Sequence, residues 1–448
     1  MKYYPLYVLV AACLFLFNET GRAMSFPPGG VITLNGTLNT GCIPHNGGTV
    51  YLQIELDARN FPMTAVCRHP MNIAVVLDRS GSMADARKID YAKKAINSLV
   101  DGLSSEDYLS IVIYDDRIDV LLPAQRVVNK ERIKRMVREI YPRGSTNLGG
   151  GMVEGFQQIE RNFRNDFVNR VILLSDGLAN TGITDPRELD RIARTYRDRS
   201  ISLTTMGVGL EYNENLMLGL AENGGGNYYF LESPHQMASI FERELNGIAL
   251  VVAQNAHIEL TLADRVTLND AVGCEWTHEG NSWILPVGDL YANARREFTV
   301  ELSLPEGSGT RRITTGVLRY REKNGWFENY PRFSVDIRYT DNAAELEKGK
   351  NWDTQAKVDV ALSTRTVERA MQALDTGRRD EACKQLEDAK AKLLSSPAML
   401  NSAAGAPAMN DQIKQLEEYS RDITSAAGDL RRAKKSIQYN NHKMQKSK

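Results

Sequence analysis

The pattern of apolar and polar residues divides the chain into three kinds of segment. Between residues 71 and 254, short apolar runs alternate with stretches in which apolar residues recur every three to four positions. Such a pattern predicts buried strands alternating with amphipathic helices around a parallel sheet. Residues 49–58 and several segments between 257 and 339 instead alternate apolar with polar side chains, as half-buried strands do. From residue 342 the helical period returns.

These segments predict an α/β protein in which a doubly wound, mostly parallel sheet is inserted in a β-sandwich and followed by a C-terminal helical region. The expected parts are an N-terminal β segment at 24–70, the α/β part at 71–254, the β-sandwich at 255–341 and the helical region with a basic tail at 342–448. Helices are expected at 84–100, 235–252 and 413–433, among others. The basic tail from residue 431 lacks a strong apolar stripe, so we expect it to be solvated and frayed.

The first residues have the composition of a targeting segment. Lys2 precedes an apolar core at 6–17, and small residues follow through Ala23. This anatomy predicts a secretory signal peptide at 1–23, with cleavage near Ala23. Lipidation at Cys13 and an uncleaved N-terminal membrane anchor are the alternatives. We therefore expect an exported protein that is periplasmic, on the cell surface or extracellular.

Overall composition adds two constraints. The chain has 448 residues with 42% hydrophobic and 25% charged residues and a formal net charge of −1, which indicates a multidomain globular protein and does not favour nucleic acid as a partner. Because export permits disulfides, Cys42 and Cys67, which flank a strand-like segment, are the expected pair. No C-x-x-C motif is present, and the six histidines lack metal-ligand spacing.

Polar residues that could bind a ligand follow the first apolar run of the α/β part. The five apolar residues at 73–77 predict a strand buried on both faces, and Asp78-Arg79-Ser80-Gly81-Ser82 comes directly after it. A carboxylate and two hydroxyls therefore emerge where a strand ends, which is the edge at which open α/β sheets bind ligands. Alone this pattern is weak, because serine and aspartate also form turns.

Two later segments supply matching oxygens. Thr146 lies before a glycine-rich helix start, and Asp176 follows the apolar run at 171–174. Oxygens from three loops of one sheet edge predict a site for a small hard cation, Mg²⁺ or else Mn²⁺ or Ca²⁺. The candidate metal-site residues are Asp78, Ser80, Ser82, Thr146 and Asp176.

With these motifs, residues 71–254 resemble the von Willebrand factor type A (VWA) domain and its metal-ion-dependent adhesion site. The segments 202–209 and 224–230 look like the last two strands of bacterial members, of the secreted or envelope type. The resemblance implies that Ser80, Ser82 and Thr146 bind the ion directly, whereas Asp78 and Asp176 act mainly through bound waters. It also implies that an Asp or Glu of a partner protein completes the coordination.

The function expected from this site is non-catalytic binding of a protein partner, in adhesion or in an envelope interaction. One alternative is a structural envelope component in which the metal only stabilises the fold. Another is a hydrolase, such as a phosphoesterase, but no histidine falls in the three site loops to act as a general base. Asp115 and Asp116 follow a further strand at the same edge, and we interpret them as a solvated turn.

Overall fold

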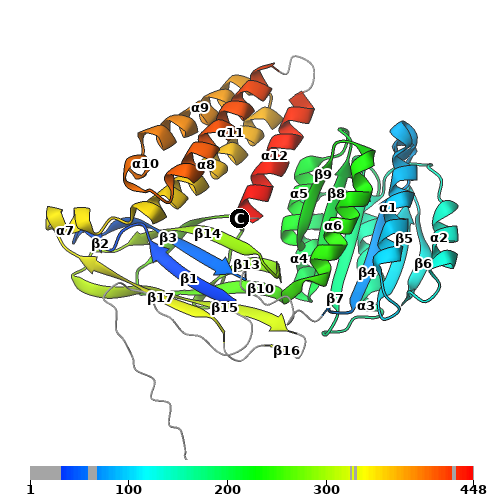
Figure 1. Ribbon diagram of the computed structural model, residues 1–448, viewed down its shortest axis with the longest axis horizontal. Coiled ribbons are helices and arrows are strands. Elements are labelled where there is room, and N and C mark those ends of the chain that lie inside the picture. Colours follow the sequence, from blue (N-terminus) through cyan, green and yellow to red (C-terminus); the bar gives the residue numbers. More distant parts are fainter. Residues whose placement is uncertain (1–31, 59–67, 323–324, 327–329, 426–429, 447–448) are drawn as a thin grey trace, which may run out of the picture.

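The computed structural model describes residues 32–58, 68–322, 325–326, 330–425 and 430–446 (Figure 1). The expected signal peptide and Cys67 lie outside these ranges, so cleavage, lipidation and the Cys42–Cys67 disulfide stay predictions. Within the described ranges, no helix is both long and apolar enough to cross a membrane.

A six-stranded sheet forms the centre of the α/β part, in the order β6-β5-β4-β7-β8-β9. The pairs from β5 to β9 are parallel, and β6 is an antiparallel edge strand. All residues of β4, β7 and β8 are buried, which explains their uninterrupted apolar runs. The strands are β4 Met71–Asp78, β5 Tyr108–Tyr114, β6 Ile118–Arg126, β7 Val168–Ser175, β8 Ile201–Val208 and β9 Gly225–Leu231.

Helices cover both faces of this sheet. Side chains of α1, α2 and α6 contribute to one hydrophobic core, and those of α3, α4 and α5 contribute to a second core on the other face. This is the doubly wound arrangement that the sequence predicted. The helices are α1 Lys88–Gly102, α2 Lys130–Arg138, α3 Leu148–Glu160, α4 Pro186–Asp198, α5 Glu214–Asn223 and α6 Met237–Ala249.

Two of the predicted helix boundaries in this part are wrong. The helix expected from residue 84 begins at Lys88, because the 3₁₀ segment η2 Gly81–Arg87 contains left-handed residues at Ala86 and Arg87, with φ of 47° and 58°. The helix expected at 235–252 is shorter: η3 Pro234–Gln236 precedes α6, and Val251 already opens strand β10. Its last apolar residues belong to a sheet of the β-sandwich.

The β-sandwich has strands from both sides of the α/β part. Strand β3 pairs with β14, so residues before and after the α/β part share one sheet, in the order β1-β3-β14-β11. The second sheet has the order β12-β13-β10-β15-β17-β2, with β16 paired to β15. The strands are β1 Thr33–Leu38, β2 Cys42–Ile43, β3 Gly48–Asp57, β10 Val251–Leu262, β11 Thr267–Val272, β12 Thr277–Glu279, β13 Ser282–Tyr291, β14 Arg295–Leu304, β15 Gly309–Glu322, β16 Gly325–Trp326 and β17 Arg332–Tyr339.

The C-terminal region is helical, as predicted, and the short helix α7 is followed by an antiparallel pair, α8 and α9, joined at Gly377 with φ of 74°. The helix expected at 413–433 is wrong, because α11 ends at Ser425 and a separate helix, α12, begins at Leu430. The helices are α7 Ala343–Lys348, α8 Trp352–Asp375, α9 Arg379–Ser395, α10 Ala398–Asn401, α11 Ala406–Ser425 and α12 Leu430–Lys446.

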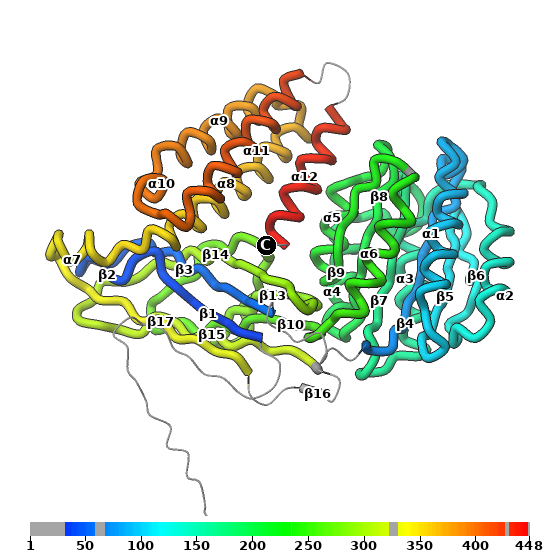
Figure 2. Tube along the Cα trace, viewed as in Figure 1, coloured from blue at the N-terminus to red at the C-terminus, as the bar shows by residue number. Residues whose placement is uncertain are grey.

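The expectation of a frayed basic tail is also wrong. Helix α12 lies between the other C-terminal helices and the α/β part, beside α5 and β9 (Figures 1 and 2). Lys435 is 1% exposed, and its ammonium donates to the Tyr212 carbonyl at 2.6 Å and pairs with Glu214. The sequence pattern misses this helix because its buried face carries Lys434 and Lys435, whose charges are compensated by Glu214 of α5 and Asp375 of α8.

Candidate metal centre

The structure brings the five candidate residues to the carboxyl edge of the central sheet. Asp78 is the last residue of β4, the serines follow it, Thr146 precedes α3, and Asp176 comes directly after β7. The two aspartates are fully buried, Ser80 and Thr146 are buried, and Ser82 is half-buried. The strands β4 and β7 are adjacent and parallel, so their ends place both carboxylates at one position.

Hydrogen bonds join the first and third loops of this cluster. The Ser82 hydroxyl donates to Asp176 Oδ1 at 2.8 Å, and the Ser80 and Ser82 hydroxyls are 3.1 Å apart. The Ser80 amide donates to Asp78 Oδ1 at 2.8 Å, which turns the chain sharply at the strand end. Both serine hydroxyls therefore lie within hydrogen-bond reach of one another beside a buried carboxylate.

Thr146 reaches the same cluster across Gly177. A Cβ atom at Gly177 would lie 3.2 Å from Thr146 Oγ1 and 3.9 Å from Ser82 Oγ, so the two hydroxyls face the same small residue. The Thr146 amide donates to Asn180 Oδ1 at 3.0 Å, which ties the second loop to the third. Among the described residues, the Thr146 hydroxyl has no hydrogen-bond partner, which leaves its oxygen available to a ligand.

Electrostatics at the cluster favour an added cation. Burial raises the pKa of Asp78 to about 6, and the nearby Asp176 charge adds to this rise, although hydrogen bonds from Ser80 and Ser175 oppose it. The Lys88 ammonium lies 2.6 Å from Asp176 Oδ2. Of the two buried carboxylates, only Asp176 pairs with this ammonium, and a further positive charge would also compensate Asp78.

The donor set fits a small hard cation. In the described part of the chain, no three side chains of histidine, cysteine, aspartate or glutamate gather in a way that could hold a metal ion. The candidate centre instead combines two carboxylates with neutral hydroxyls, all of them hard oxygen donors of the kind that Mg²⁺ and Mn²⁺ accept. Such a set suits an ion that keeps several waters or accepts an oxygen from outside.

The interpretation of Asp115 as part of a solvated turn is wrong. Asp115 is fully buried, and its Oδ2 accepts hydrogen bonds at 2.7 Å from the Nε atoms of both Arg79 and Arg143. Although burial alone would raise the pKa of Asp115, these arginines hold it below its ordinary value. Arg79 belongs to the first loop and Arg143 to the second, so Asp115 fixes the spacing of the two. Asp116 is exposed, as expected.

Two more residues of the centre escaped the sequence interpretation. The Ser175 hydroxyl donates to Asp78 Oδ2 at 2.7 Å, and Lys88 pairs with Asp176 from the first turn of α1. Ser175 stands at the end of an apolar strand, where its hydroxyl was an available signal. Lys88 gave no comparable signal, because a lysine in the first turn of an amphipathic helix usually faces solvent.

Two large apolar side chains stand exposed beside the site loops. Tyr141 is 58% exposed and precedes the loop of Thr146, while Leu178 is 55% exposed and lies two residues beyond Asp176. Both apolar side chains are therefore exposed beside a polar, buried cluster.

Comparison with known proteins is consistent with this geometry. The sequence model described as "von Willebrand factor type A domain" matches residues 72–243. The chain is similar to the uncharacterized protein YfbK of Escherichia coli, with 28% identity over 190 residues that cover 42% of this chain and 33% of that protein. It is also similar to inter-alpha-trypsin inhibitor heavy chain H3 of Rattus norvegicus, with 29% identity over 209 residues that cover 43% of this chain and 23% of that protein. The chain spans less than half the length of these relatives.

Solved structures resemble almost the whole chain. A von Willebrand factor type A protein from Catenulispora acidiphila has a TM-score of 0.73 at 15% identity, covering 95% of this chain and 99% of that one. The ArnB paralog VWA2 from Sulfolobus acidocaldarius has a TM-score of 0.61 at 15% identity, covering 93% of this chain and 100% of that one. At such low identity these likenesses show the fold alone. Residues 72–243 are a von Willebrand factor type A domain, carried in this chain together with a β-sandwich and a helical region.

Proposed function

We propose that this protein is a non-catalytic, exported binding protein that recognises an acidic residue of a protein partner through a divalent cation of the Mg²⁺ type. One observation carries the proposal. Three hydroxyls and two buried carboxylates meet at one edge of the VWA sheet, around Ser82 and Asp176, with exposed apolar side chains beside them.

The chemistry of the donor set supports a carboxylate as the partner's contribution. Ser80, Ser82 and Thr146 are neutral donors, so they would leave most of the charge of a bound divalent ion uncompensated. When bound, the ion would act as a Lewis acid that attracts one more anionic oxygen. Asp176 is already shared with Lys88 and Ser82, which limits how far the protein itself neutralises the ion. A partner's aspartate or glutamate would therefore strengthen metal binding, and the metal would strengthen partner binding, by linkage.

The hydrogen bonds that the two carboxylates already accept support a binding role rather than hydrolysis. Asp78 accepts hydrogen bonds from Ser80 and Ser175, and Asp176 accepts them from Ser82 and Lys88. A general base must be free to take a proton from the reacting group. Negligible phosphatase and esterase activity of the purified chain with Mg²⁺ or Mn²⁺ is the expected result, and metal-dependent turnover that Asp78→Ala abolishes would overturn the non-catalytic assignment.

The main test is capture of envelope proteins on the purified mature chain, with Mg²⁺ and with EDTA. The variant Asp78→Ala removes a carboxylate of the centre, and Asp116→Ala is the matched control because Asp116 is exposed at the same edge. We expect a partner retained by the native chain and by Asp116→Ala only in Mg²⁺, and lost with Asp78→Ala. Leu178→Ser should weaken the same capture without changing metal binding.

The alternative is a structural envelope component in which the cation only stabilises the fold. That role predicts partners that bind equally in Mg²⁺ and EDTA, together with a lower melting temperature for Asp78→Ala. Such a result would contradict metal-dependent recognition and would transfer partner binding to the β-sandwich or the C-terminal helices.

A further inference from the structure

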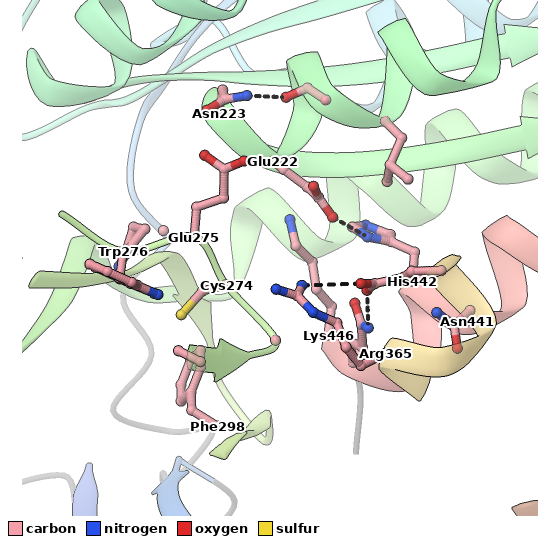
Figure 3. A pocket seen from close by; sticks show the side chains of 18 of the residues that line it. Glu222, Asn223, Cys274, Glu275, Trp276, Phe298, Arg365, Asn441, His442 and Lys446 are labelled. Carbon is pink, nitrogen blue, oxygen red and sulfur yellow. Dashed lines mark hydrogen bonds and ion pairs between the residues drawn. The ribbon is translucent and has the colours of Figure 1, made fainter. Parts of the chain in front are cut away.

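A cavity lies where the VWA domain, the β-sandwich and the C-terminal helices meet. Its volume is about 640 Å³, within the range of small-molecule sites. Figure 3 shows Glu222, Arg365 and Lys446 on one side of the cavity and Cys274, Trp276 and Phe298 on the other, with Glu275 beside Trp276. Gly225, the first residue of β9, lines the cavity, so it lies at the amino end of a parallel strand. The candidate metal centre is at the carboxyl ends, and the two sites are separate.

Arg296 is the main charged group of this cavity without a matching carboxylate. It comes from β14, lines the cavity and is 7% exposed. Among the described residues, no hydrogen bond or ion pair is found for its guanidinium. The nearby Asp289 belongs to Arg170, whose Nη2 lies 2.6 Å from its Oδ2. A buried guanidinium without a partner is costly, and such a group persists where something else compensates it.

Lys446 adds a second cation of the same kind. It lines the cavity from the end of α12, and its ammonium donates to the Gly226 carbonyl at 2.7 Å. In the described ranges, no carboxylate lies within ion-pair distance of it. Burial and then the charge of Arg296 lower the pKa of Lys446 to about 7, although the charge of Glu222 opposes this fall.

The other cations that line the cavity lie close to carboxylates. Arg365 pairs with Asp270 at 3.0 Å and with Glu368 at 3.2 Å. His442 Nδ1 lies 3.3 Å from a Glu222 carboxylate oxygen. Among the described cations that line the cavity, Arg296 and Lys446 are therefore the two without a carboxylate within ion-pair distance.

We propose that this cavity binds a small organic anion, whose carboxylate or phosphate oxygens contact Arg296 and Lys446. The apolar part of the ligand would lie against Trp276, Phe298 and Met371, which line the same space. Since the lining comes from all three parts of the chain, the ligand also holds them together, and its binding stabilises the native arrangement. This site is independent of the metal-dependent recognition proposed above.

Calorimetric titration of the full chain tests the proposal, with phenyl phosphate and benzoate as probes and neutral benzyl alcohol as the uncharged control. The two anions distinguish a phosphate from a carboxylate ligand. We expect saturable binding of at least one anion, about one per chain, and none of the alcohol. Arg296→Met and Lys446→Met should each weaken binding by about tenfold or more, the usual loss for a hydrogen bond to a charged group. Arg369→Met, an exposed arginine of α8, should leave it unchanged.

Thermal unfolding without added anion supplies a second readout. Arg296→Met should unfold at the same or a higher temperature than the native chain, because it removes an uncompensated buried charge. If that variant fails to fold, Lys446→Met and the conservative Arg296→Lys carry the test, and Arg296→Lys should keep part of the affinity. The proposal is overturned if neither probe binds at millimolar concentration. It is equally overturned if binding is the same in Arg296→Met, Lys446→Met and Arg369→Met.

Discussion

Lys88 and Asp176 form an ion pair inside the proposed metal centre, and this pair has consequences for metal affinity. Lys88 is buried, and its ammonium lies 2.6 Å from Asp176 Oδ2. A bound divalent ion and this ammonium draw on the same carboxylate, so each weakens the hold of the other. The lysine thereby compensates Asp176 in the absence of an ion and would weaken the binding of an ion at the proposed centre.

Replacing this lysine should strengthen metal binding. In Lys88→Met, the buried Asp176 carboxylate lacks its ammonium, so we expect lower stability in EDTA and a larger rise in melting temperature on adding Mg²⁺ than in the native chain. Lys94→Met is the control, because Lys94 is exposed on the same helix. The prediction fails if Mg²⁺ shifts the melting temperature of Lys88→Met by no more than that of Lys94→Met.

Arg170 connects the VWA domain to the β-sandwich through buried charges. It is fully buried on β7, and its guanidinium lies 2.6 Å from both Glu244 of α6 and Asp289 of β13. The hydroxyl of Tyr291 accepts a further hydrogen bond at 2.9 Å. Removing this arginine would leave two buried carboxylates without their cation.

We therefore expect Arg170→Met to lower the free energy of unfolding by about 3–5 kcal/mol, the usual cost of breaking a buried ion pair. Urea denaturation of the full chain measures this loss. Arg161→Met is the control, because Arg161 is exposed and its ion pair with Glu154 spans 3.7 Å. A loss below about 1 kcal/mol, as for an exposed pair, would show that the network is not needed for stability.

At the scale of single residues, the sequence predicts side chains that share a motif and misses those that meet only in space. Asp78, Ser80 and Ser82 lie within one short motif, while a predicted helix start and a predicted strand end place Thr146 and Asp176 at the same edge. Asp115 and Lys88 could not be assigned in this way. Their charged side chains are buried because their ion-pair partners, Arg79, Arg143 and Asp176, come from other loops. Sequence spacing does not show that these residues are neighbours in space.

Among the elements, α12 departs most from the sequence expectation. A basic segment with few apolar residues is normally solvated. Here Lys434 and Lys435 are buried because Glu214 of α5 faces both, and Asp375 of α8 also faces Lys434. Gly428, in the sequence between α11 and α12, was the available signal that one helix would not continue through 413–433.

Hydrogen exchange tests the docking of this helix. We expect the amides of residues 434–442 to exchange slowly, because they open only when α12 leaves α5 and α8. In Lys435→Glu, repulsion from Glu214 should speed exchange in α12 while leaving the strands of the VWA sheet protected. Complete exchange of α12 within seconds in the native chain would instead indicate the frayed tail.

The end of α12 should also make stability depend on pH. The pKa of Lys446 falls from 10.5 to about 7 in the native state. Between these values the unfolded chain binds more protons than the native one, so this lysine makes the protein more stable as pH rises from about 7 towards 10. The charged groups acting on it are Arg296 of β14, Glu222 of α5, Arg170 of β7 and Glu244 of α6.

Comparison with Lys446→Met isolates this contribution. Relative to the variant, the native chain should gain stability between pH 6 and pH 9 in urea denaturation without added anions. Phenyl phosphate should reduce that gain, because a bound anion favours the charged ammonium. A difference that is constant across this range would contradict a lowered pKa for Lys446.

Apolar runs identify strands that are buried on both faces. Alternating apolar and polar residues identify strands that are buried on one face. The end of α6 illustrates the limit. Val251 and Val252 continue the apolar stretch of the helix, yet they open β10, which pairs with β13 about forty residues further on. Only that distant pairing distinguishes a strand from one more helical turn.

On the scale of the whole molecule, one sheet separates two regions with different chemistry. The carboxyl ends of β4 and β7 carry the candidate metal centre, while the amino end of β9 faces the cavity shared with the β-sandwich and the C-terminal helices. Strands β3 and β14, which lie before and after the VWA domain in the sequence, pair with each other in the β-sandwich. The β-sandwich thus contacts the VWA domain on the side away from the candidate metal centre.

Calorimetric titration of Mg²⁺ into the full chain, after EDTA treatment and dialysis, tests the central claim most directly. The native chain should bind the ion saturably at one site per chain, and Asp78→Asn, which keeps the size of the side chain, should lose that binding while Asp116→Asn retains it. Absence of saturable binding to the native chain, or equal binding by Asp78→Asn, would contradict a metal centre at this edge.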